Sequence, residues 1–127
     1  MKTLSVRQPH AWLIVAGFKT IESRTWRTNY RGPLQIHASQ KLDAGEIDRI
    51  EAAFGVVIDR SALHRGGIVG RVTLVDVVTS SSSPWFTGPF GWVLECPRML
   101  RFEPWRGSRA LFEAPTISAP PSTATDR

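Results

Sequence analysis

Apolar and polar residues alternate in three short segments of the first forty positions. Residues 4–8 alternate, the segment 19–26 alternates, and so does the segment 34–39. A period of two is typical of a strand with one buried face. In the segment 34–39, the apolar face holds Leu34, Ile36 and Ala38, while His37 and Ser39 fall on the polar face. The pattern therefore predicts three strands before residue 40.

Two further segments carry the signals of helices. The segment 9–17 begins with proline, which the first helical position tolerates, and ends at Gly17 after an apolar middle. These features predict a helix of about two turns. In the segment 43–55, Asp43 is followed three residues later by Glu46, which resembles a capping box, and apolar residues then recur at helical spacing up to a glycine. A second, amphipathic helix is predicted there.

The second half of the chain is dominated by β-branched residues. Residues 66–78 give the strongest strand prediction, and residues 90–97 give another, followed by short strands within 102–107 and 110–114. From position 115 to 127, Pro, Ser and Thr predominate, which predicts a disordered C-terminal tail. We therefore expect one α+β domain over residues 1–114, with a small mixed β-barrel and about two flanking helices.

Composition narrows the class of protein. A chain of 127 residues with 42% apolar residues matches a single domain, and it has no apolar run long enough to span a membrane. Cys96 is the sole cysteine, which rules out an internal disulfide and agrees with a reducing cytosol. The three histidines show no metal-ligand spacing. We expect a soluble cytoplasmic protein without a metal or a cofactor, whose oligomeric state the sequence leaves open.

The positive charge is concentrated at one end of the sequence. Residues 1–40 contain six basic residues and one acidic residue, whereas residues 41–127 contain ten of each. All of the formal net charge of +5 therefore belongs to the first third, and a localised basic region is typical of phosphate-backbone binding. Trp26 lies among these charges and Trp85 lies in a predicted loop, so both could stack on bases; packing in the core is the alternative.

Several polar residues of the first forty are candidates for chemistry. Lys19 follows the turn at Gly17, and Glu22 and Arg24 share one face of the next predicted strand. These three side chains could form a structural salt-bridge group that lines a cleft, or Lys19 could be catalytic if burial lowers its proton affinity. His37 and Ser39 could hydrogen-bond a ligand, although a strand histidine is more often structural.

An ordered set of motifs resembles the ASCH domain family, the activating-signal-cointegrator homology module. The motifs are S-x-R-Q-P from position 5, G-x-K-x-x-E-x-R-x-W from position 17, Y-R-G from position 30 and I-H-A-S from position 36. The resemblance implies a fold similar to the PUA domain of RNA-modifying enzymes. It also implies a cleft that binds RNA or single-stranded nucleic acid, lined by Arg7, Gln8, Lys19, Glu22, Arg24, Trp26, Arg31, His37 and Ser39.

The same family includes small hydrolases that deacetylate acetylated cytidine nucleosides. Their pattern places a threonine three residues after the lysine, and in this sequence Glu22 occupies that position. Without that hydroxyl the expected nucleophile is missing. We therefore predict nucleic-acid or modified-nucleotide binding. The alternatives are an amidohydrolase or ribonuclease that uses Lys19 with Glu22 or His37, and a protein-interaction module.

Overall fold

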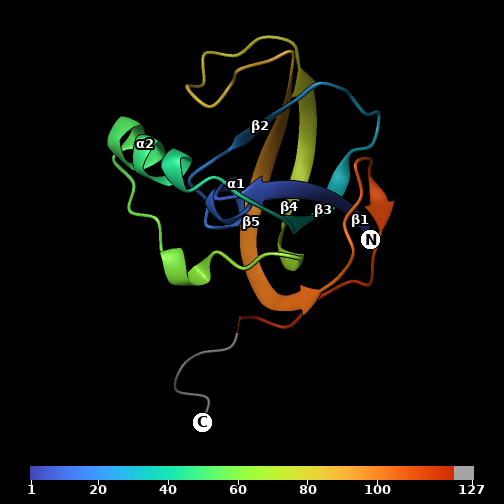
Figure 1. Ribbon diagram of the computed structural model, residues 1–127. Coiled ribbons are helices and arrows are strands. Elements are labelled where there is room, and N and C mark those ends of the chain that lie inside the picture. The colour runs from blue at the N-terminus through green and yellow to red at the C-terminus, as the bar shows by residue number, and fades with distance from the viewer. Residues whose placement is uncertain (122–127) are drawn as a thin grey trace.

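The computed structural model describes residues 1–121, which form one mixed sheet with two helices (Figure 1). Its strands pair in the order β2-β5-β4-β3-β1-β6, and only β1 and β3 run parallel. The elements are β1 (Lys2–Gln8), α1 (His10–Val15), β2 (Ile21–Arg24), β3 (Gly32–Leu42), α2 (Ala44–Phe54), the 3-10 helix η1 (Arg60–Ala62), β4 (Gly67–Val78), β5 (Phe90–Pro104) and β6 (Phe112–Glu113).

The predicted α+β class and both predicted helices are confirmed, but a closed barrel is not. The edge strands are short, with four residues in β2 and two in β6, and no pairing joins these two edges within residues 1–121. The sheet instead curls, and the pairing register between β4 and β5 shifts along its length (Figure 1). Such shifts arise at β-bulges, where an extra residue in one strand bends and twists it. The short strand predicted within residues 102–107 is in fact the end of the long β5.

The main core lies between α1 and the sheet. Val15 of α1 packs so closely on β4 that a Cβ atom at Gly70 would come 2.4 Å from its Cγ1 atom. Next to this glycine the pairing register of β4 shifts against both of its neighbours, β3 and β5. A glycine within a strand often marks such a bulge. A second apolar cluster, which includes Trp12, Ile47 and Ile50, joins α1 to α2. Both helices are therefore fixed relative to the strands that carry the polar residues.

Residues 115–121 run along the sheet. The amide group of Gln35 bonds to Pro115 O at 3.0 Å and to Ile117 N at 2.8 Å, and Arg71 donates to Ile117 O at 2.7 Å. This part of the predicted disordered tail is therefore hydrogen-bonded to β3 and β4. The remainder of that prediction, residues 122–127, lies outside the described residues.

Candidate functional site

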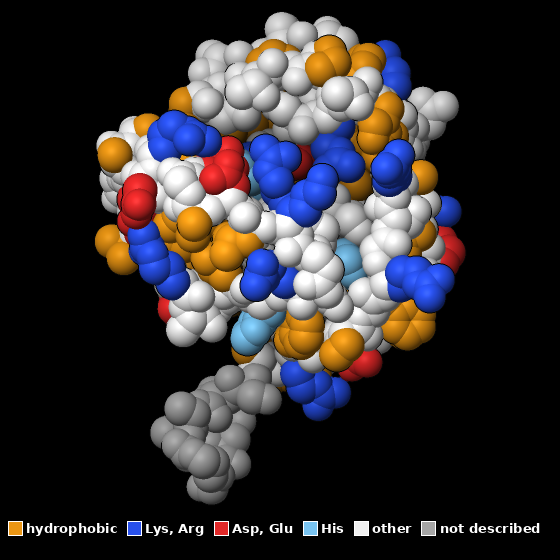
Figure 2. Space-filling view, viewed as in Figure 1, with side chains coloured by type: hydrophobic (Ala, Val, Ile, Leu, Met, Phe, Trp, Pro, Cys, Tyr) orange, Lys and Arg blue, Asp and Glu red, His pale blue; other side chains and the backbone are white. Residues whose placement is uncertain are grey.

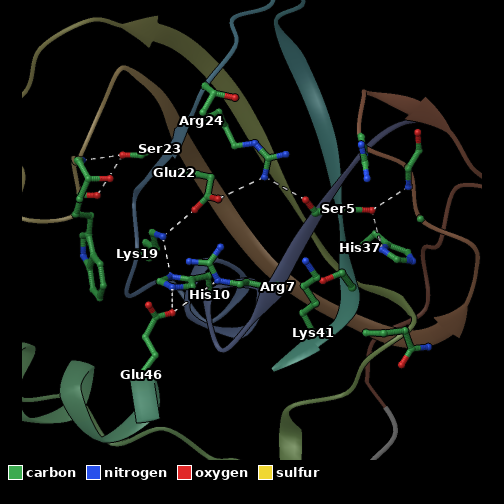
Figure 3. A pocket seen from close by; sticks show the side chains of 18 of the residues that line it. Ser5, Arg7, His10, Lys19, Glu22, Ser23, Arg24, His37, Lys41 and Glu46 are labelled. Carbon is green, nitrogen blue, oxygen red and sulfur yellow. Dashed lines mark hydrogen bonds and ion pairs between the residues drawn. The ribbon is translucent and has the colours of Figure 1, made fainter. Parts of the chain in front are cut away.

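An open cleft of about 1380 Å³ lies between β1, β2, the end of β3 and α2 (Figure 3). Residues 84–87 close one side and residues 105–110, which follow β5, close another. The lining includes two carboxylates, Glu22 and Glu46, and seven basic side chains: Arg7, Lys19, Arg24, Lys41, Arg49, Arg106 and Arg109. Figure 2 shows Lys and Arg side chains gathered at the centre of one face of the molecule. The cleft is therefore strongly basic.

The turn after α1 positions Lys19. Gly17 has φ of 91°, a left-handed conformation that glycine adopts without strain, so the helix ends there as predicted. The backbone N–H groups of Phe18 and Lys19 both bond to Leu13 O at 2.9 Å. These bonds turn the chain back towards the cleft, where the Lys19 side chain is only 7% exposed.

Lys19 is part of a hydrogen-bonded chain of four residues. Its Nζ atom lies 2.7 Å from Oε1 of Glu22 and 2.8 Å from Nδ1 of His10 (Figure 3). The Nε2 atom of His10 in turn contacts Oε1 of Glu46 on α2. Because an ammonium group can only donate, Nδ1 accepts from Lys19 and Nε2–H donates to Glu46. This arrangement requires the neutral form of His10.

Burial lowers the pKa of the His10 imidazole below its ordinary value of 6.5, and the neighbouring Lys19 ammonium contributes to the decrease. The carboxylates of Glu22 and Glu46 oppose this effect without reversing it. The electrostatic setting of His10 thus agrees with the neutral state that its hydrogen bonds require.

This lowered pKa predicts a loss of stability in mild acid. The unfolded chain protonates His10 more readily than the folded protein, so the free energy of unfolding should fall as the pH drops below about 6.5. Melting temperatures measured between about pH 7.5 and 5.5 check this expectation. The His10→Gln variant should lose this contribution to the decline, and parallel pH profiles for the two proteins would contradict the prediction.

Arg24 connects β2 to β1. Its Nη1 atom donates to Ser5 O at 3.2 Å and lies 3.6 Å from Oε2 of Glu22. Its guanidinium group also stands 5.6 Å from the ring centre of Trp26, within the range of a cation–π contact. Glu22 therefore compensates two cations at once, Lys19 and Arg24, as the shared strand face of Glu22 and Arg24 predicted.

His37 lies on the other side of the cleft from Lys19 (Figure 3). Its Nε2 atom is 2.7 Å from Trp105 O and its Nδ1 atom is 3.0 Å from Oγ of Ser5. A carbonyl only accepts, so Nε2–H donates to Trp105 and, in the neutral ring, Nδ1 accepts from the Ser5 hydroxyl. This buried ring lines the cleft, and both of its nitrogens have protein partners.

The two candidate stacking residues line the cleft and also pack against other aromatic rings. Trp85 stacks on Phe54 of α2 with ring centres 3.7 Å apart, and Lys19 Nζ lies 5.7 Å from the centre of its ring. Trp26 packs edge-on against the fully buried Trp92 at 4.9 Å. Both rings are only partly buried, so each combines a packing role with an exposed part at the cleft.

Of the other residues predicted for the site, Arg7 and Ser39 line the cleft, whereas Gln8 and Arg31 do not. Gln8 is fully buried, accepting from Trp12 N at 3.0 Å and donating to His64 O at 2.8 Å, so it joins α1 to the chain before β4. Arg31 pairs with Asp76 of β4 at 3.7 Å. Their inclusion in the predicted cleft is thus not supported.

The sequence reasoning missed several lining residues. His10 and Glu46 belong to different helices, and their pairing has no signal in a single sequence. Arg106 and Arg109 lie in residues 41–127, whose charges sum to zero, so the charge split did not single them out. The sequence R-G-S-R, with two arginines around a glycine, was the one local signal that could have indicated them.

Residues 1–121 contain neither a candidate metal site nor a helix that could span a membrane. No group of three or more His, Cys, Asp or Glu residues in this range is placed to hold a metal ion. No helix in this range is both long and apolar enough to cross a membrane.

Comparison with known proteins places these features in a family. The ASCH domain model matches residues 4–87. The human protein activating signal cointegrator 1 is 33% identical over 82 residues, which cover 60% of this chain and 14% of that protein. The mouse protein of the same name is 32% identical over the same shares. The chain thus spans about one seventh of the length of these relatives.

A solved structure shares the fold. The crystal structure of an ASCH S128A mutant protein from Zymomonas mobilis superposes with a TM-score of 0.51 at 15% sequence identity. The superposition covers 81% of this chain and 72% of that one. At this level of identity the likeness concerns the fold alone.

Proposed function

Because the chain belongs to the ASCH domain family, we propose that its basic cleft binds single-stranded RNA or another single-stranded nucleic acid. The charge of the cleft lining carries this proposal, since seven basic side chains face the cleft with only two carboxylates. A groove of this charge attracts the phosphates of a nucleic-acid strand and releases their counterions.

The size of the cleft favours a strand over a single nucleoside. Sites for small molecules usually occupy about 300–1,000 Å³. The cleft exceeds that range at about 1380 Å³ and is open to solvent, which favours a ligand of several nucleotides. Exposed parts of Trp26 and Trp85 lie among the cations, where unstacked bases could rest on them.

The surroundings of Lys19 support binding over amide hydrolysis. An acyl-transfer site of the predicted kind needs a hydroxyl within hydrogen-bond reach of the lysine. Within residues 1–121, the hydrogen bonds of Lys19 Nζ go to a carboxylate and an imidazole. In this proposal Lys19 and Glu22 form a buried ion pair that lines the binding cleft.

The relatives named activating signal cointegrator 1 bear on a second candidate ligand, which is a protein. The match covers 14% of the length of these relatives, and their name describes them as cointegrators. A protein partner at the same cleft is the alternative. Capture of a partner from extract that persists after nuclease treatment would favour that alternative.

A direct test uses a labelled RNA oligonucleotide of about ten residues and fluorescence anisotropy. The protein should bind the single strand more tightly than a duplex of the same sequence, because a duplex keeps its bases stacked and out of reach. The Lys41→Ala variant, which removes an exposed cation of the cleft, should bind more weakly than Arg98→Ala, which removes an exposed cation outside it. Equal affinity of these two variants would argue against the cleft as the binding site.

A further inference from the structure

Residues 106–109, hereafter the RGSR loop, form a wall of the cleft that lies outside residues 4–87, the range matched by the family model. The loop follows the end of β5 and leads to β6, and all four of its residues line the cleft. Arg106 and Arg109 are both exposed, and neither has a carboxylate within salt-bridge distance in the described part of the chain.

Two hydrogen bonds between side chains of the sheet and the backbone of this segment fix the loop to the sheet. His37 of β3 donates to Trp105 O at 2.7 Å, immediately before the loop, and Ser108 N donates to Oγ of Ser5 at 3.3 Å. Ser5 and His37 are themselves bonded at 3.0 Å, so the two attachments form one network (Figure 3). The Trp105 N–H group adds a bond to Gly66 O at 3.1 Å.

The loop also lies in direct contact with this network. A Cβ atom at Gly107 would come 2.6 Å from Oγ of Ser5 and 2.7 Å from Cε1 of His37. Any larger residue at this position would therefore push the loop away from β1 and β3. The glycine allows the backbone to lie flat on these two side chains, and the arginines on either side of the Gly-Ser pair remain exposed at the cleft.

The charges on the two sides of the cleft differ. On the side of β2, the cations Lys19 and Arg24 are compensated by Glu22. The RGSR loop has no such carboxylate in the described residues, so its positive charge is available to an anion. Guanidinium groups suit phosphate especially well because their N–H groups can bind two oxygens at once.

From this geometry we infer that the RGSR loop is a phosphate-binding wall of the cleft, held in place by Ser5 and His37. The inference rests on the proposed function and assigns part of the backbone recognition to Arg106 and Arg109. Ser5 and His37 act as positioning residues, because they contact the loop rather than the strand.

The test compares two double variants of equal net charge. Arg106→Ala/Arg109→Ala removes the loop cations, and Arg98→Ala/Arg101→Ala removes two exposed arginines of β5 that do not line the cleft. Binding of a labelled single-stranded RNA is measured over a range of salt concentrations, and thermal melting checks that both variants fold.

The slope of log affinity against log salt is negative, and each lost phosphate contact should reduce its steepness by about 0.7. The loss of two contacts corresponds to roughly tenfold weaker binding near physiological salt. We expect this change in the loop variant and a much smaller one in the control. The Arg106→Lys/Arg109→Lys variant should recover most of the slope. The Gly107→Ala variant should weaken binding without any change in charge, since it displaces the loop.

The outcomes separate the two levels of the proposal. If the unmodified protein does not bind the single strand, the proposed function fails. If it binds with a clear salt dependence and the loop variant matches the β5 control in both affinity and slope, the function stands and the inference about the RGSR loop is overturned.

Discussion

Replacing Lys19 with methionine should lower the free energy of unfolding by about 3 kcal/mol, a large fraction of the stability of a small domain. Methionine keeps most of the length of the side chain but removes its charge. The carboxylate of Glu22, which is only 10% exposed, would lose its partner at 2.7 Å and keep only Arg24 at 3.6 Å. Nδ1 of His10 would lose its donor as well. Urea denaturation monitored by tryptophan fluorescence measures the effect.

A double-mutant cycle separates the pair from its surroundings. Glu22→Gln alone should also destabilise the protein, because Lys19 would then be buried without a carboxylate partner. The double variant Lys19→Met/Glu22→Gln should cost less than the sum of the two single changes, because it leaves neither charge unpaired. Lys41→Met is the matched control, since Lys41 is an exposed lysine of the same cleft and should change stability by less than about 0.5 kcal/mol. A similarly small effect at Lys19 would show that the pair is not a structural element.

The pairing of Lys19 with Glu22 illustrates how far local sequence patterns reach. The glycine that ends α1 and the alternation after it placed Lys19, Glu22 and Arg24 together, because turns and strand faces are set by neighbouring residues. The structure adds His10 as a partner of Lys19, and Glu46 as a partner of His10. These contacts depend on how α1 and α2 pack against each other. The spacing of apolar and polar residues within one segment does not predict that packing.

Alternation was less informative where both faces of a strand are covered. In the middle of β3 the predicted polar face is buried, because residues 105–117 lie over it: His37 bonds to Trp105 O, and Gln35 bonds to Pro115 and Ile117. The period of two identifies the strand correctly but does not show what covers its polar face. The family resemblance implied Gln8 at the cleft, but Gln8 instead supplies buried hydrogen bonds between α1 and the loop before β4.

The charge split located only part of the basic surface. It identified residues 1–40, which supply Arg7, Lys19 and Arg24 to the cleft. The charges of the remaining residues sum to zero, so the split did not identify Arg106 and Arg109, which line the cleft. The acidic side chains that balance this sum include those of α2, which pair locally, as Glu51 does with Arg60 at 2.9 Å. A net charge summed along the sequence does not show which charges pair with each other and which face the cleft in the folded protein.

The largest expected effect on binding is its response to salt. Three cations of the cleft, Lys41, Arg106 and Arg109, have no carboxylate within salt-bridge distance in residues 1–121, so these are the cations most available to phosphates. Three phosphate contacts on a single strand give a slope of about −2 in log affinity against log salt. Affinity for a single-stranded RNA should therefore fall about twentyfold between about 50 and 200 mM salt.

Isothermal titration or anisotropy at several salt concentrations measures this slope. The compensated cations Lys19 and Arg24 already have Glu22 as a partner, so they should add little to it. An uncharged ligand such as a free nucleoside provides the control, because it releases no counterions and its binding should be almost independent of salt. An affinity for RNA that is equally insensitive would mean that contacts to bases, and not to phosphates, hold the strand, and the basic lining of the cleft would then need another explanation.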